Sequence, residues 1–334
     1  MMVYLKNLMR LPGLYSRLQG NLKFQKKFLN KTLVVDIAES KKTNDDSLSD
    51  KDYLKITNYY GLAVPAVLGE SFCVLRGRDM TEDERMALSY LGGLTGLFDD
   101  FFDEKGMTEE HILQLISNTN NPVFHSSHEK LFIDFYSKAL ENTSDKSLLM
   151  DYFTKVYEAQ VLSKKQVSGF IDSNEIKSIT YEKGGISLLF YRCALDGKMD
   201  NMEKLLLYKL GGLMQLENDI FDIYKDNAGG IKTLPTTETQ MGKVRDLYKS
   251  LVVEVFDDVL RTSYSPQGKK AFNSILSMIL CRGFVCLDML ECLQEKTNGV
   301  FSIEKYDRKD LICDMEKPVN ILKTINYFAK YTNS

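Results

Sequence analysis

The 334-residue sequence contains no tryptophan, three histidines and six prolines. With so little histidine, and with six cysteines that form no CxxC pair, the sequence argues against a zinc site of Cys and His ligands, so any bound metal is expected to have oxygen ligands. Lys and Arg total 43 against 46 Asp and Glu, which gives a formal net charge of −3. This balance favours neither a nucleic-acid-binding surface nor an acidic tail.

Long apolar runs are also missing. No uninterrupted apolar stretch approaches the roughly 18 residues that span a bilayer, and the N-terminus lacks the apolar core of a signal peptide. Cys281, Cys286 and Cys292 lie within one apolar helical segment, which is typical of buried, reduced thiols. We therefore expect a soluble, cytoplasmic protein.

What the sequence does contain is helical periodicity. Apolar residues recur at i, i+3, i+4 and i+7 in segment after segment, and the few prolines rarely interrupt them, so the pattern predicts an all-α protein. Thr81 with Glu84, and Ser126 with Glu129, form capping boxes that begin two of the helices. The expected helices are residues 52–75, 82–104, 108–118, 127–142, 146–168, 174–196, 201–226, 238–262, 267–297 and 309–331.

The polar stretch from Lys41 to Asp52 divides residues 1–50, a basic N-terminal arm and linker, from a single helical domain at residues 51–334. The first 35 residues contain no acid, and their basic residues are interleaved with Leu, Val, Tyr and Phe. A solvated cationic helix is the favoured interpretation, and contact with an anionic membrane surface is the alternative. The basic residues are Lys6, Arg10, Arg17, Lys23, Lys26, Lys27 and Lys31.

Two segments of the sequence repeat one another at an offset of 119 positions. LGGLTGLFDDFFDE spans residues 91–104, and LGGLMQLENDIFDIYKD spans residues 210–226. Both end an apolar helix in a group of acids. Residues four apart share a helix face, so Asp99 and Asp103 point the same way, as do Asn218, Asp222 and Asp226.

Acids at these positions are unusual for a solvated helix end. They meet the negative end of the helix dipole, which disfavours each by roughly 0.3–1 kcal/mol. They are also embedded in apolar residues, including Phe98, Phe102 and Phe221, which suggests the mouth of an apolar cavity. Bound Mg²⁺ resolves both problems, because it takes one or two protein carboxylates and leaves its other positions to water and substrate phosphate. Lys183, Arg192, Lys225 and Lys232 lie close enough in sequence to hold a diphosphate.

These two motifs resemble those of the class I isoprenoid synthases, all-helical enzymes that ionise prenyl diphosphates with Mg²⁺. Asp99, Asp100 and Asp103 match the DDxxD motif of that family. Asn218, Asp219, Lys225 and Asp226 fall in register with the NDxx(S/T)xx(K)E motif of terpene cyclases, although Asp222 replaces a hydroxyl and Asp226 replaces Glu. The resemblance implies a single domain of antiparallel helices around a central apolar cavity.

The resemblance also implies a cluster of three Mg²⁺ ions, for which Mn²⁺ could substitute. Its ligands would be Asp99, Asp100, Asp103, Asn218, Asp222 and Asp226. Lys183 corresponds to a diphosphate-binding lysine of elongases, and Gly184 with Gly185 either breaks the helix, as in cyclases, or allows close helix packing. Arg192 is the candidate for the arginine that senses diphosphate. Thr95, Phe98, Phe102, Phe190, Tyr191 and Phe221 are candidates to line the cavity.

Several reactions remain open within this family. Because the basic motifs with which elongases bind isopentenyl diphosphate are missing, a terpene synthase that cyclises or rearranges one C15 to C20 or longer prenyl diphosphate is favoured. A condensing enzyme, either chain-elongating or of the head-to-head squalene or phytoene type, is the alternative, since Asp99/Asp103 and Asp222/Asp226 have DxxxD spacing. A non-catalytic subunit that binds prenyl diphosphate is the third possibility. Helical enzymes of this kind often pair, so a homodimer is also expected.

Overall fold

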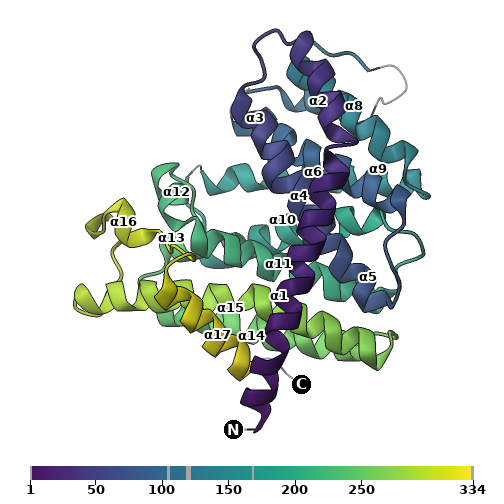
Figure 1. Ribbon diagram of the computed structural model, residues 1–334. Helices are drawn as coiled ribbons and strands as arrows, with labels where there is room; N and C mark the ends of the chain where they lie inside the picture. The colour runs from purple at the N-terminus through teal and green to yellow at the C-terminus, as the bar shows by residue number, and fades with distance from the viewer. Residues whose placement is uncertain (1, 104–105, 118–121, 168, 332–334) are drawn as a thin grey trace. The chain divides into compact units, whose positions relative to one another are not determined.

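The computed structural model describes residues 2–103, 106–117, 122–167 and 169–331, and every regular element within these ranges is a helix (Figure 1). The prediction of an all-α protein is confirmed. Contacts divide the chain into two compact units, which we name after helices α6 (Glu82–Asp103) and α11 (Asn201–Phe221). The α6 unit comprises Tyr15–Glu158 and Phe190–Lys198, and the α11 unit comprises Met1–Leu14, Ala159–Leu189 and Met199–Ser334. Helices α1 (Met2–Leu29), α9 (Lys146–Ser163) and α10 (Ser173–Cys193) contribute residues to both units.

The α6 unit is built around the pairing of α6 with α8. Helix α8 spans Ser127–Glu141. The other helices that lie wholly within this unit are α2 (Leu33–Lys42), α3 (Asp50–Lys55), α4 (Gly61–Ala63), α5 (Glu70–Arg76) and α7 (Glu109–Ser117). Between α3 and α5 the chain stays helical but passes through two wider, π-helical turns, Ile56–Tyr60 and Val64–Gly69. Buried aromatic rings form the core; the ring centroids of Phe98 and Phe153 are 5.2 Å apart, and those of Phe101 and Phe132 are 4.9 Å apart.

The predicted N-terminal arm is helical and partly packed. Leu29, Leu33, Ile37 and Leu48 are each at most 6% exposed, so residues between Tyr15 and Asp50 contribute to the core of the α6 unit. No helix among the described residues is long and apolar enough to cross a membrane.

The α11 unit is built around α11, which packs against α14 (Met241–Arg261) and α15 (Pro266–Lys296). Helix α17 (Pro318–Tyr331) packs on α15. The shorter helices are α12 (Ile223–Ala228), α13 (Leu234–Thr237) and α16 (Arg308–Leu311). Leucines at the helical spacing that the sequence indicated, such as Leu206 and Leu213, are fully buried.

Glycines allow the central helix of each unit to approach a neighbour very closely. A Cβ atom built on Gly184 would lie 2.1 Å from the carbonyl oxygen of Gly211, so α10 and α11 touch backbone to backbone there. In the α6 unit, a Cβ on Gly92 would lie 2.5 Å from the carbonyl oxygen of Tyr60. Helix α10 runs unbroken through Gly184 and Gly185, so the packing interpretation of these glycines is correct and the helix break does not occur.

Both central helices also begin in a similar way. Before α6, Thr81 Oγ1 accepts from the backbone N–H of Glu84 at 3.2 Å, and Glu84 Oε2 accepts from the N–H of Thr81 at 2.8 Å, the capping box that the sequence predicts. Before α11, Asp200 Oδ1 accepts from the N–H of Glu203 at 2.7 Å. The positions match at the same offset of 119, so the repeat extends over the whole of each helix.

Candidate functional site

The second acidic motif lies at the end of α11 and the start of α12. Asp222 interrupts regular helix between the two, with φ −89° and ψ 10°, whereas the sequence predicted one helix as far as residue 226. The turn-by-turn hydrogen bonding nevertheless continues, because the N–H of Asp222 donates to Asn218 O and the N–H of Asp226 donates to Asp222 O, both at 2.8 Å. Asn218 Nδ2 donates to Asp222 Oδ2 at 3.4 Å. The three side chains therefore follow one another along a single face.

The electrostatics of this motif indicate an excess of negative charge. Burial raises the pKa of Asp226 to about 7, and the carboxylates of Asp219 and Asp222 add to the increase. Lys225 and Lys183 oppose it. Lys183 on α10 is therefore close to the acids of α11 and α12, as the sequence expected of a diphosphate-binding lysine. A cation among these carboxylates would remove the repulsion between them.

Asp219 differs from its neighbours because it is turned into the α11 unit. It is 4% exposed, and it accepts hydrogen bonds from Gln215 Nε2 at 2.8 Å and from Thr180 Oγ1 at 3.2 Å. Burial raises its pKa to about 6. Glu217 is also buried, with its carboxylate 3.6 Å from Arg282 Nη2, and burial raises its pKa to about 7. The sequence analysis did not single out Thr180, Gln215 or Glu217.

The first acidic motif lies at the end of α6, and its acids also differ from one another in burial. Asp99 is half-buried and lies close enough to Tyr191 to contribute to the raised pKa of that phenol, whose main cause is burial. Tyr191 Oη is 2.6 Å from Thr95 Oγ1. The side chain of Asp103, the last residue of α6, lies outside the described part of the structure.

Asp100 is the counterpart of Asp219 and is 6% exposed. Its carboxylate accepts from Lys55 Nζ at 3.1 and 3.3 Å and lies 3.8 Å from His128 Nε2. Burial acts to raise the pKa of Asp100, but the nearby His128 and the hydrogen bonds from Lys55 outweigh it and lower the pKa. The Asp100 carboxylate that the sequence assigned to a metal is thus engaged by a lysine. The sequence did not point directly to Lys55. One signal was nevertheless present: the pair Ile-Thr stands shortly before Gly61 and again shortly before Gly184, and both glycines pack on a central helix.

The aromatic candidates separate into core and surface residues. Phe98 is 4% exposed and Phe190 is 3% exposed, and both pack against Phe153, at centroid separations of 5.2 and 4.9 Å. Phe102, Tyr191 and Phe221 are only partly buried. Arg282 Cζ lies 5.9 Å from the centre of the Phe221 ring.

Small residues such as Gly92 and Gly93 precede the first motif and could leave open space beside α6. Gly92 instead packs against Tyr60, and a Cβ on Gly93 would lie 2.9 Å from the ring of Phe135. These two glycines serve helix contacts, so they give no indication of substrate length.

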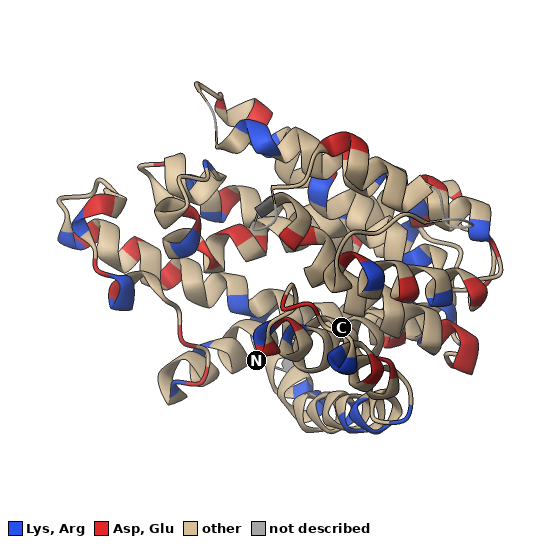
Figure 2. Cartoon of the chain, turned by 90° about the horizontal axis from the view of Figure 1, so that it is seen from above, with Lys and Arg blue, Asp and Glu red and all other residues tan. Residues whose placement is uncertain are grey.

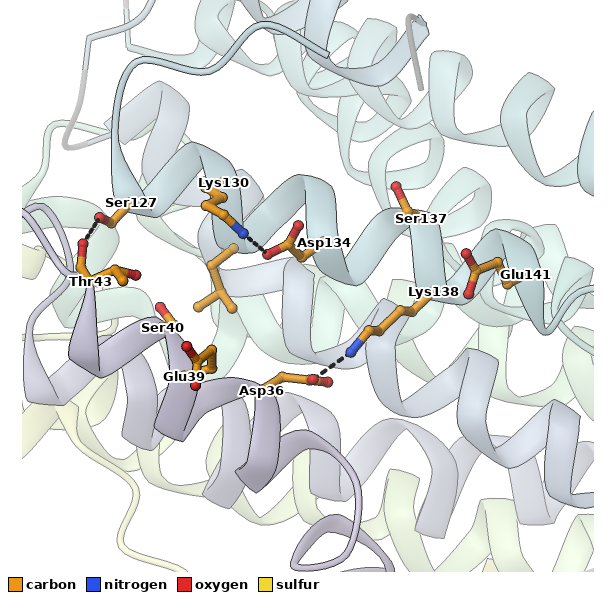
Figure 3. A pocket seen from close by; sticks show the side chains of 11 residues that line it. Asp36, Glu39, Ser40, Thr43, Ser127, Lys130, Asp134, Ser137, Lys138 and Glu141 are labelled. Carbon is orange, nitrogen blue, oxygen red and sulfur yellow. Dashed lines mark hydrogen bonds and ion pairs between the residues drawn. The ribbon is translucent and has the colours of Figure 1, made fainter. Parts of the chain in front are cut away.

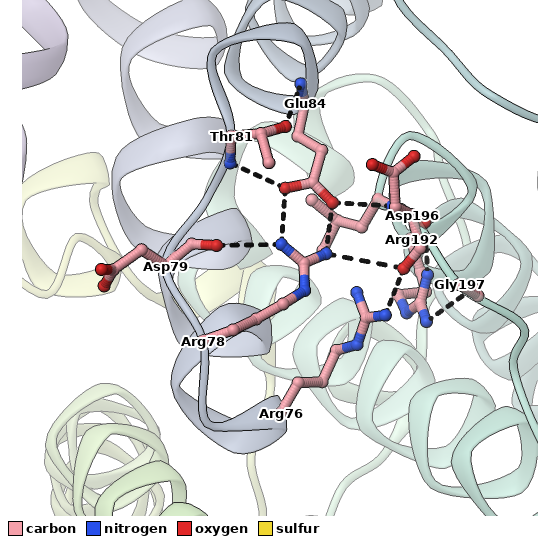
Figure 4. A network of polar contacts seen from close by, with 9 residues as sticks. Arg76, Arg78, Asp79, Thr81, Glu84, Arg192, Asp196 and Gly197 are labelled. Atoms are coloured by element: carbon pink, nitrogen blue, oxygen red, sulfur yellow. Dashed lines mark hydrogen bonds and ion pairs between the residues drawn. The ribbon is translucent and has the colours of Figure 1, made fainter.

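Arg192 is 1% exposed, and from the last turn of α10 its guanidinium reaches the loop that follows the helix (Figure 4). Its Nη1 donates to Leu195 O at 2.8 Å and its Nη2 donates to Gly197 O at 3.2 Å. The same loop is attached to the start of α6, where Glu84 accepts from the N–H of Asp196 at 2.7 Å and from the guanidinium of Arg78. Arg192 is thus engaged by backbone carbonyls.

The remaining basic candidates differ from one another. Lys225 is exposed, whereas Lys232 Nζ donates to Gly169 O and its backbone N–H donates to Gln166 O at 2.9 Å. Lys183 and Lys225 both act electrostatically on Asp226 of the second motif.

A polar groove of about 500 Å³ lies between α2 and α8 in the α6 unit (Figure 3). Charged pairs cross or border it, among them Lys138 with Asp36 and Lys130 with Asp134. Its lining is unlike the predicted apolar cavity. Within the described ranges, no three His, Cys, Asp or Glu side chains come together as a ready-made metal site.

No family model matches the sequence, and no curated protein matches it. Among solved structures, the chain is similar to a dehydrosqualene synthase crystallised in complex with ligand, with 13% sequence identity and a TM-score of 0.46. The match covers 95% of this chain and 98% of that chain. A likeness of this extent carries no argument about function.

Proposed function

We propose that the chain is a Mg²⁺-dependent isoprenoid synthase that ionises a prenyl diphosphate by breaking its allylic carbon–oxygen bond. The proposed Mg²⁺ ligands are Asp99 and Asp103 of the first motif and Asn218, Asp222 and Asp226 of the second. Lys183 and Lys225 are proposed to bind the diphosphate. The proposal rests on the resemblance of both motifs to class I isoprenoid synthases and on the local geometry of the second motif.

One observation carries the proposal furthest. Asn218, Asp222 and Asp226 follow one another at single-turn spacing, and the carboxylates beside Asp226 add to the burial that raises its pKa to about 7. A helix end that is merely exposed to solvent gains nothing from carboxylates that repel one another beside a lysine. Binding of a divalent cation together with an anionic phosphate gives a reason for this arrangement.

The donor set fits Mg²⁺ chemically. All five proposed ligands offer carboxylate or amide oxygens, which this hard cation prefers, and one or two carboxylates for each ion are sufficient when water and phosphate complete the octahedron. Bound Mg²⁺ would supply Lewis acidity to the diphosphate leaving group.

Different residues of the chain would then stabilise the two charges that ionisation creates. As the carbon–oxygen bond breaks, its electron pair leaves with the diphosphate, and the ammonium groups of Lys183 and Lys225 stabilise that developing negative charge. The positive charge left on the allylic carbon requires a surface without nucleophiles. Aromatic rings that are only partly buried, such as those of Phe102, Tyr191 and Phe221, can stabilise this positive charge by roughly 0.5–2 kcal/mol each.

The cation can be cyclised or can condense with a second prenyl diphosphate. Asp100 and Asp219 accept hydrogen bonds within their own units, and the proposed metal ligands among the acids form two pairs, Asp99 with Asp103 and Asp222 with Asp226. Pairs four residues apart are the DxxxD pattern associated with head-to-head condensing enzymes. This observation makes head-to-head condensation the second candidate function beside the cyclisation that the missing elongase motifs favour.

The reaction is tested by incubating the purified chain with Mg²⁺ and prenyl diphosphates of graded length from below C15 to C20 and above, and measuring diphosphate release and the mass of extracted products. A hydrocarbon or alcohol with the carbon number of its substrate indicates a terpene synthase. A doubled carbon number indicates head-to-head condensation, and lengthening only when isopentenyl diphosphate is added indicates elongation. Binding of a prenyl diphosphate without any release would contradict the proposal and indicate a non-catalytic subunit.

The proposed ligands are tested by Asp222→Asn with Asp226→Asn, and separately by Asp99→Ala with Asn218→Ala. Each double variant is expected to reduce diphosphate release by about 100-fold or more while its helical circular dichroism stays unchanged. The matched control is Asp246→Asn with Asp257→Asn, two exposed acids of α14, which should retain full activity. Equal activity in the Asp222/Asp226 variant and this control would place the chemistry elsewhere.

A further inference from the structure

Residues 15–35 of the α6 unit carry positive charge alone, and we call them the basic segment. They contain Arg17, Lys23, Lys26, Lys27 and Lys31, all exposed, and no Asp or Glu. Most other helices carry residues of both signs, as Figure 2 shows with Lys and Arg in blue and Asp and Glu in red. The basic segment is therefore a local exception in a chain whose net charge is −3.

The cations of the basic segment differ in their ion pairing from other cations of the α6 unit. Lys41 pairs with Asp50 at 3.1 Å, and Lys130 pairs with Asp134 at 2.5 Å. Over the ranges for which the structure is described, none of the five cations of the basic segment forms an ion pair with an acid. Like charges held together in this way repel one another, and an external anionic surface would relieve the repulsion.

The basic segment is held rigidly by its inner face. Gln25 is fully buried, and its Nε2 donates to Gly61 O at 3.1 Å and to Ser89 Oγ at 2.7 Å. Lys23 and Lys27 stand two residues to either side of Gln25, about 200° around the helix, so they lie on the outer face. The cations are thus presented by a helix whose orientation on its unit is fixed.

Apolar side chains are exposed among these cations. Tyr15 is 59% exposed, Phe24 is 57% exposed and Val35 is 62% exposed. The guanidinium of Arg85 lies 4.8 Å from the centre of the Phe24 ring, which braces that ring at the surface. Aromatic residues favour the interface between lipid headgroups and acyl chains, and aliphatic residues such as valine also gain by entering it. Nucleic-acid phosphates offer a valine nothing comparable.

We propose that the basic segment binds the surface of an anionic phospholipid bilayer. Its lysines and Arg17 meet headgroup phosphates. Tyr15 and Phe24, nine residues apart and therefore about half a turn from each other, flank the outer face of α1, and with Val35 they reach the boundary with the acyl chains. The inference does not depend on the proposed enzymatic function, because every residue that it uses lies outside the two acidic motifs.

The test is co-sedimentation of the full chain with vesicles of phosphatidylcholine alone and with vesicles of phosphatidylcholine and phosphatidylglycerol in equal parts. Binding is expected to the anionic vesicles only and to weaken as salt is raised, since the attraction is screened beyond a Debye length. Lys23→Glu with Lys27→Glu should weaken it by at least about 25-fold, taking about fivefold for each basic charge lost near the surface.

The matched control is Lys249→Glu with Lys270→Glu, which changes the net charge equally at two exposed lysines of α14 and α15 and should bind as the parent chain does. Tyr15→Ser with Phe24→Ser should weaken binding by an amount that salt does not alter. The proposal is overturned if anionic and neutral vesicles bind equally, if both charge-reversal variants bind alike, or if the chain binds RNA and no vesicle. Circular dichroism of each variant excludes loss of the helices as the cause.

Discussion

Helices α6 and α11 carry nearly the same sequence into two different surroundings. In both, a glycine contacts the backbone of a neighbouring helix and the second acid of the motif turns inward. The buried acid of α6, Asp100, meets Lys55, and its pKa is lowered. The buried acid of α11, Asp219, meets the neutral groups of Thr180 and Gln215, and its pKa is raised to about 6. Burial acts to raise both pKa values, so the direction of the change depends on whether the partners of the acid outweigh that burial, as they do at Asp100 but not at Asp219.

The largest loss of stability is expected from substitutions of Gly211 and Gly92, the glycines at equivalent positions of α11 and α6. Gly211→Ala should destabilise the chain by about 3 kcal/mol or more, because its Cβ would lie 2.2 Å from the carbonyl oxygen of Gly184 and neither backbone can yield cheaply. Gly92→Ala, which meets Tyr60 O at 2.5 Å, should follow closely. Urea unfolding measures both. Gly242→Ala is the control, since its Cβ would meet nothing within 4 Å, and a loss as large as that of Gly211→Ala there would refute the steric explanation.

A smaller effect is expected at the starts of the helices. Burial acts to raise the pKa of Glu84, but hydrogen bonds from Arg78 and two backbone N–H groups outweigh it and hold the pKa at about 2, below its ordinary 4.5. Because the pKa is depressed in the folded state, the stabilisation is complete above about pH 4.5 and is lost as the pH falls towards 2. Glu84→Gln should therefore destabilise by about 2 kcal/mol at neutral pH, and this difference should shrink on acidification.

Urea unfolding of Glu84→Gln over a pH series provides the measurement. Glu82→Gln, an exposed acid of the same turn, is the control and should change stability by a few tenths of a kcal/mol. At the start of α11 the cap is a carboxylate that Asn can replace, so Asp200→Asn should stay within about 0.5 kcal/mol of the parent. A difference for Glu84→Gln that did not change with pH would rule out the ionised carboxylate as its source.

The smallest effects are expected from the partners of the two buried acids. Lys55→Met removes a charged donor from Asp100 and should destabilise by about 1–2 kcal/mol. Thr180→Val removes one neutral donor from Asp219, which keeps Gln215, and should destabilise by about 1 kcal/mol. Chemical unfolding at neutral pH ranks the two. A larger loss for Thr180→Val would reverse the comparison between the helices.

Periodicity was sufficient to predict the helices themselves. Residues 82–104 and 267–297 were expected, and Glu82–Asp103 and Pro266–Lys296 are observed, because long amphipathic patterns and caps are local properties. The bend at Asp222 was not expected, since nothing in the sequence LENDIFDIYKD stops a helix.

The candidate site was predictable only in part. Spacing of four residues predicts that Asn218, Asp222 and Asp226 share one face, but it cannot tell which acids are buried, and Asn218 is exposed whereas Asp226 is buried. Which acids are buried depends on partners such as Lys55 and Thr180, which lie 45 and 39 positions from the acids that they bind. Arg192 illustrates the same limit, because the sequence suggested a diphosphate-sensing role for it, whereas its buried guanidinium donates to carbonyls of the loop after α10.

The backbone contact between Gly184 and Gly211 has a mechanical consequence for the acids beyond it. Asn218 stands two turns further along α11, about 10 Å from the crossing. Because the two glycines meet backbone to backbone, a tilt of α11 by about 5° about this contact would displace Asn218 by about 1 Å. In the proposed enzyme a displacement of that size could change a catalytic rate about 100-fold, so a methyl group added at Gly211 would disturb the proposed site without touching it.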